Sequence, residues 1–217
     1  MKTLIAIPCM DMVHTKFAES LINLTRKAPH DTYVCMKPSS LIYDARNLLS
    51  LTAIENEFDR VMWLDSDMEF TQDALQRLHT VMDHGYDLVT GIYVRRKEPI
   101  IPVLYKRISA PESTGGNIKK CVEDYLDYTS DTIFPVDGCG FGCVLTKTSL
   151  LKHVWDAFGP AFSPLPWAGE DISFCYRAKQ IGAKMVCDSS VKFGHIGSVV
   201  FTESLFLKQR GDTLAKE

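Results

Sequence analysis

Val61-Met62-Trp63-Leu64-Asp65-Ser66-Asp67 is a short apolar run followed directly by two aspartates. The apolar residues are typical of a buried strand, so the aspartates are expected at its carboxyl end. Ligands of open α/β sheets bind at the carboxyl ends of the strands, where Mg²⁺ or Mn²⁺ is held by carboxylates and substrate phosphate oxygens. The pattern therefore predicts either a metal site for a phosphorylated ligand or two acids that cap a helix beginning near Thr71.

Strand-like and helix-like segments alternate on both sides of this stretch, which is typical of an α/β fold with a mainly parallel sheet. Before it, the patterns predict strands at 3–8 and 32–36 and helices at 15–27 and 40–56. After it, they predict a helix from Thr71, strands at 87–94, after the glycine-rich turn at 138–142 and at 183–187, and helices at 148–155 and 170–182. Between 95 and 134 the periodicity weakens, and we expect a short strand at 101–106 within a variable loop region.

The length and composition favour one domain that spans residues 1–217. A chain of 217 residues with 46% hydrophobic residues can form one sizeable core but is short for two. The net charge of −3 gives no general attraction to nucleic acid, and local basic clusters such as Arg95-Arg96-Lys97 are typical of solvated surface. No uncharged apolar run approaches the ~18 residues of a membrane span. We therefore expect no integral membrane segment.

The cysteines indicate a reducing compartment. Their number is seven, which is odd, and most lie in apolar segments. This usage fits a cytoplasmic location. Cys139 and Cys143 are closely spaced, but no second Cys or His pair complements them as a structural zinc site requires.

Polar residues at three other places could join the two aspartates. Arg46 and Asn47 lie early in the helix at 40–56, near the strand ends or on an ordinary solvated helix start. Glu170 and Asp171 open a later helix, where acids are favourable in any protein, by ~0.3 to 1 kcal/mol, and where a carboxylate could also serve as a general base. His195 follows the last strand; it could be an ordinary packed histidine or join carboxylates around a metal.

The order of these motifs resembles that of the GT-A glycosyltransferases, particularly the family-2-like group that uses nucleotide-sugar donors. The motifs are, in order, Pro8, Ala45-Arg46-Asn47, Leu64-Asp65-Ser66-Asp67, the turn Gly138-Cys139-Gly140-Phe141-Gly142, Gly169-Glu170-Asp171, Arg177-Ala178-Lys179-Gln180-Ile181-Gly182 and His195-Ile196-Gly197. The resemblance covers nearly the whole chain apart from the middle loop. It implies a GT-A (Rossmann-like) fold, a mixed and mainly parallel sheet flanked by helices in a single domain.

The resemblance also implies a function. The chain would move a sugar from a nucleotide-diphosphate donor, with a UDP-sugar as the expected donor, to an acceptor hydroxyl, with inversion at the anomeric carbon. Mn²⁺ or Mg²⁺ would be the cofactor. The implied metal ligands are Asp67 and His195, with Asp65 on the metal or the ribose. The implied nucleotide-sugar contacts are Pro8, Arg46, Asn47, Asp65, Gly138 and Gly140.

The implied general base is Asp171, and Glu170 is the second candidate for that role. A general base must lie within hydrogen-bond reach of the acceptor hydroxyl, so geometry decides between the two carboxylates. Many relatives carry an acid for the nucleobase where this chain has Met36-Lys37-Pro38, so the sequence leaves the base open. It also leaves open the acceptor and the oligomeric state.

Three alternatives remain at this level. A haloacid-type phosphohydrolase also places Asp-x-Asp after a strand, but normally near the N-terminus and before a hydroxyl residue where this chain has Glu69. A nucleotidyltransferase of related fold would carry a glycine-rich, basic phosphate loop after the first strand, which is not visible here. A non-catalytic nucleotide-sugar-binding protein would carry the same binding residues.

Overall fold

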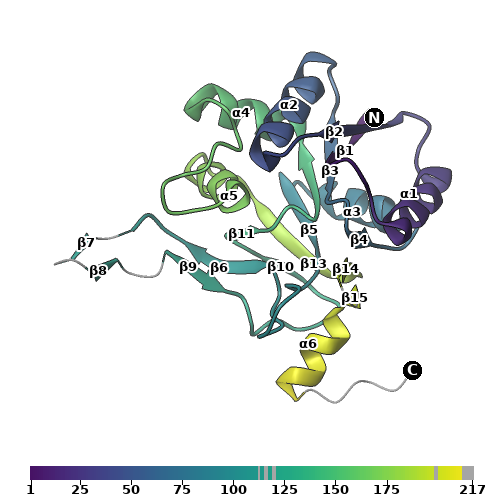
Figure 1. Ribbon diagram of the computed structural model, residues 1–217. Helices are drawn as coiled ribbons and strands as arrows, with labels where there is room; N and C mark the ends of the chain where they lie inside the picture. The colour runs from purple at the N-terminus through teal and green to yellow at the C-terminus, as the bar shows by residue number, and fades with distance from the viewer. Residues whose placement is uncertain (112, 115–116, 119–120, 198–199, 212–217) are drawn as a thin grey trace.

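The computed structural model describes residues 1–111, 113–114, 117–118, 121–197 and 200–211, and its centre is a seven-stranded sheet between helices (Figure 1). The strand order is β10-β13-β5-β12-β3-β1-β2. These strands are β1 (Thr3–Cys9), β2 (Thr32–Pro38), β3 (Arg60–Leu64), β5 (Leu88–Ile92), β10 (Ile133–Pro135), β12 (Cys143–Lys147) and β13 (Met185–Lys192). The helices are α1 (Thr15–Lys27), α2 (Ile42–Glu55), α3 (Ala74–Met82), α4 (Thr148–Phe158), α5 (Glu170–Gln180) and α6 (Glu203–Arg210).

The sheet is mixed and mainly parallel, as the sequence predicts. Strand β1 pairs in parallel with β2 and β3, and β5 pairs in parallel with β13. Strand β12 lies antiparallel between β3 and β5, and β10 is antiparallel to β13. Five of the seven strands therefore point the same way, and β1 and β3 end side by side.

Alternating side chains of the central strands fill two separate cores. Leu4 and Ala6 of β1 belong to the core under α2, α4 and α5, whereas Ile5 and Ile7 belong to the core under α1 and α3. This alternation follows from the two-residue period of a strand. It explains the continuous apolar runs, because a strand covered on both faces has no side exposed to water.

An aromatic cluster lies in the first core, below the carboxyl end of β3. Its members are Trp63, Phe141, Phe162 and Phe174, whose ring centroids are 4.7 to 5.9 Å apart. The Trp63 indole N–H donates to the hydroxyl of Thr146 at 3.0 Å, so its polar group is satisfied inside the core. The residues at the carboxyl end of β3 therefore lie on closely packed aromatic rings.

Residues 95–134 contain more regular structure than the variable loop that we predicted. The strand expected at 101–106 is β6 (Leu104–Ile108), which pairs with β9 (Val122–Asp124) and β11 (Gly138–Cys139). The same region supplies β7 (Ser113–Thr114), β8 (Asn117–Ile118) and the edge strand β10. These strands are short and pair in part with segments outside the region, so local periodicity does not reveal them. Residues 112, 115–116 and 119–120 of the predicted loop lie outside the described residues.

All the predicted helices are present, with boundaries that differ from the predictions by up to three residues. Helix α1 has the predicted bounds, whereas α2 begins at Ile42 and α3 begins at Ala74, three residues after the predicted cap. Thr71 accepts the Ala74 N–H with its backbone carbonyl, and a turn intervenes before the helix. None of the helices in the described ranges is both long and apolar enough to cross a membrane.

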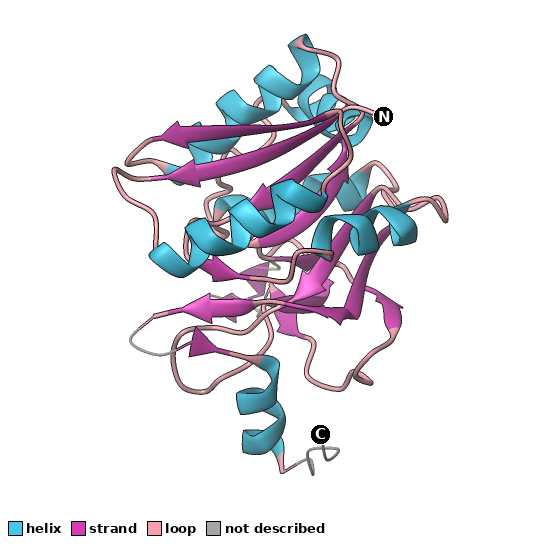
Figure 2. Ribbon diagram, turned by 90° about the vertical axis from the view of Figure 1, so that its right-hand side faces the viewer, coloured by secondary structure: helices cyan, strands magenta, loops and turns pink. Residues whose placement is uncertain are grey.

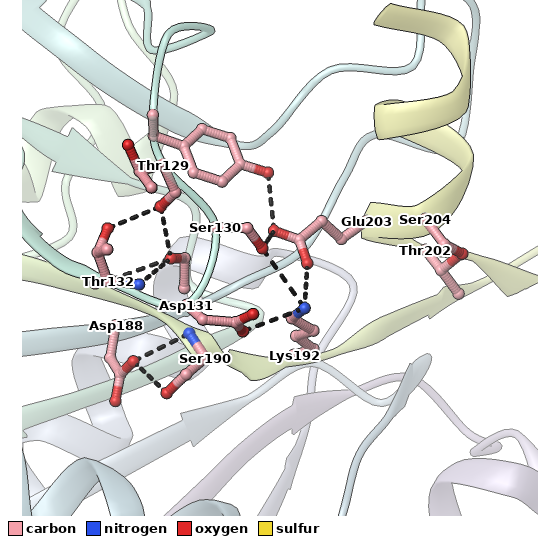
Figure 3. A network of polar contacts seen from close by, with 12 residues as sticks. Thr129, Ser130, Asp131, Thr132, Asp188, Ser190, Lys192, Thr202, Glu203 and Ser204 are labelled. Carbon is pink, nitrogen blue, oxygen red and sulfur yellow. Dashed lines mark hydrogen bonds and ion pairs between the residues drawn. The ribbon is translucent and has the colours of Figure 1, made fainter. Parts of the chain in front are cut away.

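Helix α6 lies apart from the two helical layers and is fixed by one buried carboxylate (Figures 2 and 3). Glu203 is 3% exposed, and its Oε2 lies 2.8 Å from the Lys192 ammonium at the end of β13. Its Oε1 accepts the hydroxyls of Tyr128 and Ser130 at 2.9 and 3.2 Å. This network ties α6 to the strand that leads into β14 (Gly194–Ile196).

A buried histidine lies near the amino ends of β1 and β3. The Nδ1 atom of His79 accepts from the Arg60 guanidinium at 2.8 Å, and Nε2 lies 3.4 Å from the Thr3 hydroxyl. Burial and the charge of Arg60 lower the pKa of His79 to about 4. The native protein therefore holds this imidazole neutral, whereas the unfolded chain protonates it from about pH 6.5 downward.

The first prediction concerns this histidine. Because the folded pKa is lowered, the stability that depends on neutral His79 is present above about pH 6.5 and is lost toward pH 4, by about 1 to 3 kcal/mol. Urea unfolding followed near neutral pH and again near pH 4.5 measures this loss. In His79→Gln the loss should be smaller; an identical pH dependence in both proteins would contradict the prediction.

Candidate active site

A cavity of about 360 Å³ opens where β1, β2 and β3 end. The acidic stretch after β3 lies in its wall, as the sequence predicts, and Pro8 closes β1 beside it. The residues that line it are Pro8, Cys9, Met10, Ser39, Ser40, Ile42, Asp65, Ser66, Asp67, Arg96 and His195. Its size is in the range of small-molecule sites, about 300 to 1,000 Å³.

Backbone pairing brings Asp67 and His195 together. Directly after Asp67, β4 (Met68–Glu69) pairs with β14, and His195 lies opposite Met68. The distance from His195 Nε2 to Asp67 Oδ2 is 3.7 Å, longer than a hydrogen bond. On the other side of the ring, Nδ1 lies 2.9 Å from the carbonyl oxygen of Val94. A proton on Nδ1 satisfies that carbonyl and leaves the Nε2 lone pair directed to the cavity side, the arrangement of a metal-binding histidine.

Asp67 has one oxygen without a partner. Its Oδ1 is buried and makes no hydrogen bond in the described structure. Burial raises the pKa of Asp67, but the contact with His195 and the charge of Arg96 outweigh it and lower that pKa below its usual value. The ionised carboxylate faces the imidazole nitrogen with Oδ2 and keeps Oδ1 without a partner, which fits a divalent cation on Oδ2 and His195.

The two side chains do not enclose a cation by themselves. Among the described residues, no group of three or more His, Cys, Asp or Glu side chains is placed to hold a metal ion. An ion on Asp67 and His195 would need water or phosphate oxygens for its other positions, which is the usual state of Mg²⁺ in phosphate-binding sites.

Arg46 lies below the cavity rather than in its wall. It is 2% exposed, and its two terminal nitrogens donate to Asp65 Oδ1 at 2.8 Å and to Glu170 Oε1 at 2.5 Å. Its Cζ lies 5.5 and 5.9 Å from the ring centroids of Phe141 and Phe162. Burial lowers the pKa of Arg46, but the charges of Asp65, Glu170 and Asp171 outweigh it and raise that pKa. Arg46 therefore joins α2, the end of β3 and α5, and its contact with a nucleotide stays a prediction.

Three other predicted binding residues have structural partners. Asn47 accepts the backbone N–H of Phe162 with its side-chain oxygen at 2.8 Å. Gly138 and Gly140 are buried outside the cavity lining. A Cβ on Gly140 would lie 2.0 Å from the Tyr93 hydroxyl oxygen, so the turn needs glycine for packing. The Tyr93 ring in turn packs edge-on against the His195 ring, with 5.4 Å between the ring centroids. The glycine turn therefore supports His195 through Tyr93.

Asp171 is the carboxylate whose acidity departs most from the usual value near the site. It is partly exposed in the first turn of α5, where its Oδ1 accepts the Ile172 N–H at 2.7 Å. Burial raises its pKa, Arg46 opposes this and Glu170 adds to it, and the result is a pKa of about 6. A base of that pKa can accept a proton near neutral pH. Glu170 is held by Arg46, so Asp171 is the freer of the two candidates.

Arg96 belongs to the site but was not among the predicted site residues. Its Nη1 lies 2.8 Å from Asp67 Oδ2 and donates to the carbonyl oxygen of Ile196 at 3.1 Å. The sequence signal was the basic cluster at 95–97, which we interpreted as solvated surface. No sequence signal singles out the other lining residues, which are Cys9, Met10, Ser39, Ser40 and Ile42.

Comparison with solved structures identifies the architecture. No family model and no curated protein matches the sequence. A crystal structure of A197 from STIV superposes with a TM-score of 0.66 at 21% identity, over 91% of this chain and 86% of that one. A crystal structure of GalNAc-T7 with UDP, GalNAc and Mn²⁺ gives a TM-score of 0.63 at 11% identity, over 91% of this chain and 44% of that one. This chain has a GT-A-like fold. The likeness supports that fold and not the narrower family-2 group; the chain also spans less than half of the GalNAc-T7 chain.

The second prediction tests the buried arginine. Arg46→Met leaves Asp65 and Glu170 without their cationic partner, and we expect a loss of about 2 to 4 kcal/mol in the free energy of unfolding. Urea unfolding at neutral pH measures it.

The matched control is Lys152→Met, which removes the exposed ion pair with Asp156 on α4. That variant should change stability by less than about 1 kcal/mol. Equal effects of the two substitutions would refute the role of Arg46 as the cross-link of the site.

Proposed function

We propose that this chain is a glycosyltransferase that moves a sugar from a nucleotide-diphosphate donor to an acceptor hydroxyl with inversion. The observation that carries the proposal is one arrangement at one edge of the sheet. Asp67 and His195 line a cavity side by side and could bind a metal ion together. Asp171, with a pKa raised to about 6, lies beside Arg46 and its carboxylate partners. The GT-A-like fold and the UDP, GalNAc and Mn²⁺ in the GalNAc-T7 structure add support.

The donor side consists of the cavity wall. Asp67 and His195 would hold Mn²⁺ or Mg²⁺, with Asp65 as a further contact to the ion or the ribose. When bound, the ion would supply positive charge for the departing nucleoside diphosphate. Pro8 and the neighbouring Ser39 and Ser40 would line the nucleoside portion, for which UDP is the first candidate.

The acceptor side consists of the start of α5. Asp171 would take the proton of the acceptor hydroxyl on its carboxylate while that oxygen bonds to the anomeric carbon. The bond from the anomeric carbon to the diphosphate oxygen breaks, and its electron pair leaves with the nucleoside diphosphate. A single displacement assisted by one base inverts the anomeric centre. Glu170 would stay on Arg46 and fix the position of its neighbour.

Two broader features belong to the same proposal. Residues 1–217 would form one glycosyltransferase domain. Four cysteines, Cys139, Cys143, Cys175 and Cys187, are buried as free thiols. This supports a reducing, cytoplasmic compartment.

The third prediction addresses the base. Asp171→Asn keeps the hydrogen bond to Ile172 but cannot accept the proton, so transfer should fall by about 10² to 10⁴-fold with nucleotide binding retained. Release of nucleoside diphosphate from a panel of nucleotide sugars and acceptors measures transfer, and thermal shift measures nucleotide binding.

Asp156→Asn on the exposed face of α4 is the control and should retain the full rate. Transfer by Asp171→Asn at the unmodified rate would refute the assignment of the base. If the unmodified protein binds nucleotide but neither hydrolyses nor transfers any donor in the panel, the non-catalytic alternative holds instead.

The fourth prediction is independent of any substrate. Because the folded pKa of Asp171 lies above the unfolded value of 3.8, its ionisation destabilises the native state above about pH 6, and the effect vanishes near pH 4. Asp171→Asn should therefore raise the free energy of unfolding near neutral pH, by up to about 3 kcal/mol. Urea unfolding at both pH values checks it; a gain of equal size near pH 4 would contradict it.

A further inference from the structure

We propose that Arg96 is an exchangeable counterion. It neutralises Asp67 while no divalent cation is bound and moves to the donor diphosphate when a cation takes its place. The inference rests on the proposed function and assigns to Arg96 a role in coupling cation and donor binding.

The first argument is the position of the guanidinium. Arg96 Nη1 lies 2.8 Å from Asp67 Oδ2, the same oxygen that faces His195 Nε2 at 3.7 Å. A cation shared by Asp67 and His195 would use this oxygen. Two positive groups at one carboxylate oxygen repel each other strongly, because the interaction of unit charges about 4 Å apart is several kcal/mol near a protein surface. Arg96 and a divalent ion therefore compete for Asp67.

The second argument is the contrast with the buried arginine. Arg46 is 2% exposed and held by two carboxylates, whereas the Arg96 side chain is 46% exposed and pairs with one. Partly exposed ion pairs contribute little, about 0 to 1 kcal/mol. Arg96 also borders a second cavity of about 440 Å³ on the side of Lys97 and Val103. Its guanidinium can thus leave Asp67 at small cost in free energy.

The third argument is the charge of the cavity. Among the described residues that line the 360 Å³ cavity, Arg96 is the one Lys or Arg side chain. A nucleoside diphosphate brings negative oxygens into this space, and the planar guanidinium can donate two hydrogen bonds to a phosphate. The diphosphate of the nucleotide-sugar donor can therefore pair with Arg96 when the cation binds Asp67.

This exchange makes the two ligands help each other. A diphosphate that attracts Arg96 uncovers Asp67 for the cation, and a cation on Asp67 frees Arg96 for the diphosphate. Coupling of this kind is reciprocal, so each ligand must raise the affinity of the other by the same factor. Removal of Arg96 should abolish this part of the coupling.

The test is a titration with Mn²⁺ alone, in which electron paramagnetic resonance counts the free ion. Arg96→Met removes the competing charge, so it should bind Mn²⁺ about fivefold or more tightly than the unmodified protein without nucleotide. At saturating Mn²⁺, the same variant should bind UDP more weakly. The increase in Mn²⁺ affinity caused by UDP should be smaller than in the unmodified protein.

Two variants serve as controls. Arg96→Lys keeps the charge and should bind Mn²⁺ much as the unmodified protein does. Arg95→Met removes the neighbouring arginine, which pairs with Asp124, and should leave Mn²⁺ affinity unchanged. Thermal unfolding of each variant confirms that the proteins compared are folded.

The outcomes separate this inference from the proposed function. Mn²⁺ affinity that is unchanged or lower in folded Arg96→Met overturns the role of Arg96, even if the protein transfers sugar. Absence of donor turnover by the unmodified protein counts against the proposed function, even if Arg96→Met binds Mn²⁺ more tightly.

Discussion

The buried guanidinium of Arg46 is the interaction on which the site depends. It lies on the aromatic cluster of the first core and is held by one carboxylate from the end of β3 and one from the start of α5. A charge in this position is tolerable because two anions and two ring faces replace its water. The same contacts fix the orientation of the Asp65 and Glu170 side chains. They also set the separation between the end of β3 and the start of α5.

The site therefore has two parts with different chemistry. On one side, Asp67 and His195 are held by the β4–β14 pairing and backed by Tyr93, and their exposed partner is Arg96. On the other side, Asp171 lies in the first turn of α5, where burial raises its pKa. One carboxylate is kept ionised and the other is kept ready to accept a proton. Such divergence of two acids is typical of sites that divide roles between them.

Sequence patterns predicted the order of the elements and the edge of the sheet where the acids lie, because strand and helix periods and cap residues are local signals. The resemblance to GT-A glycosyltransferases implied that Asp65, Asp67 and His195 lie near one another, and all three line the cavity. The sequence patterns did not show that Arg46 and Asn47 are packed or that Gly140 accommodates Tyr93, since burial depends on distant segments. The role of Arg96 was hidden for the same reason, because its partner lies on another strand end.

The contacts that complete the site join residues far apart in the chain. Arg46 and Glu170 are separated by 124 positions, and His195 and Val94 by 101. Contacts of such separation close large loops, which costs conformational entropy and slows folding. During synthesis, the cavity wall can close only after the segment around His195 has left the ribosome. A partly made chain therefore presents strands and helices but no complete cavity.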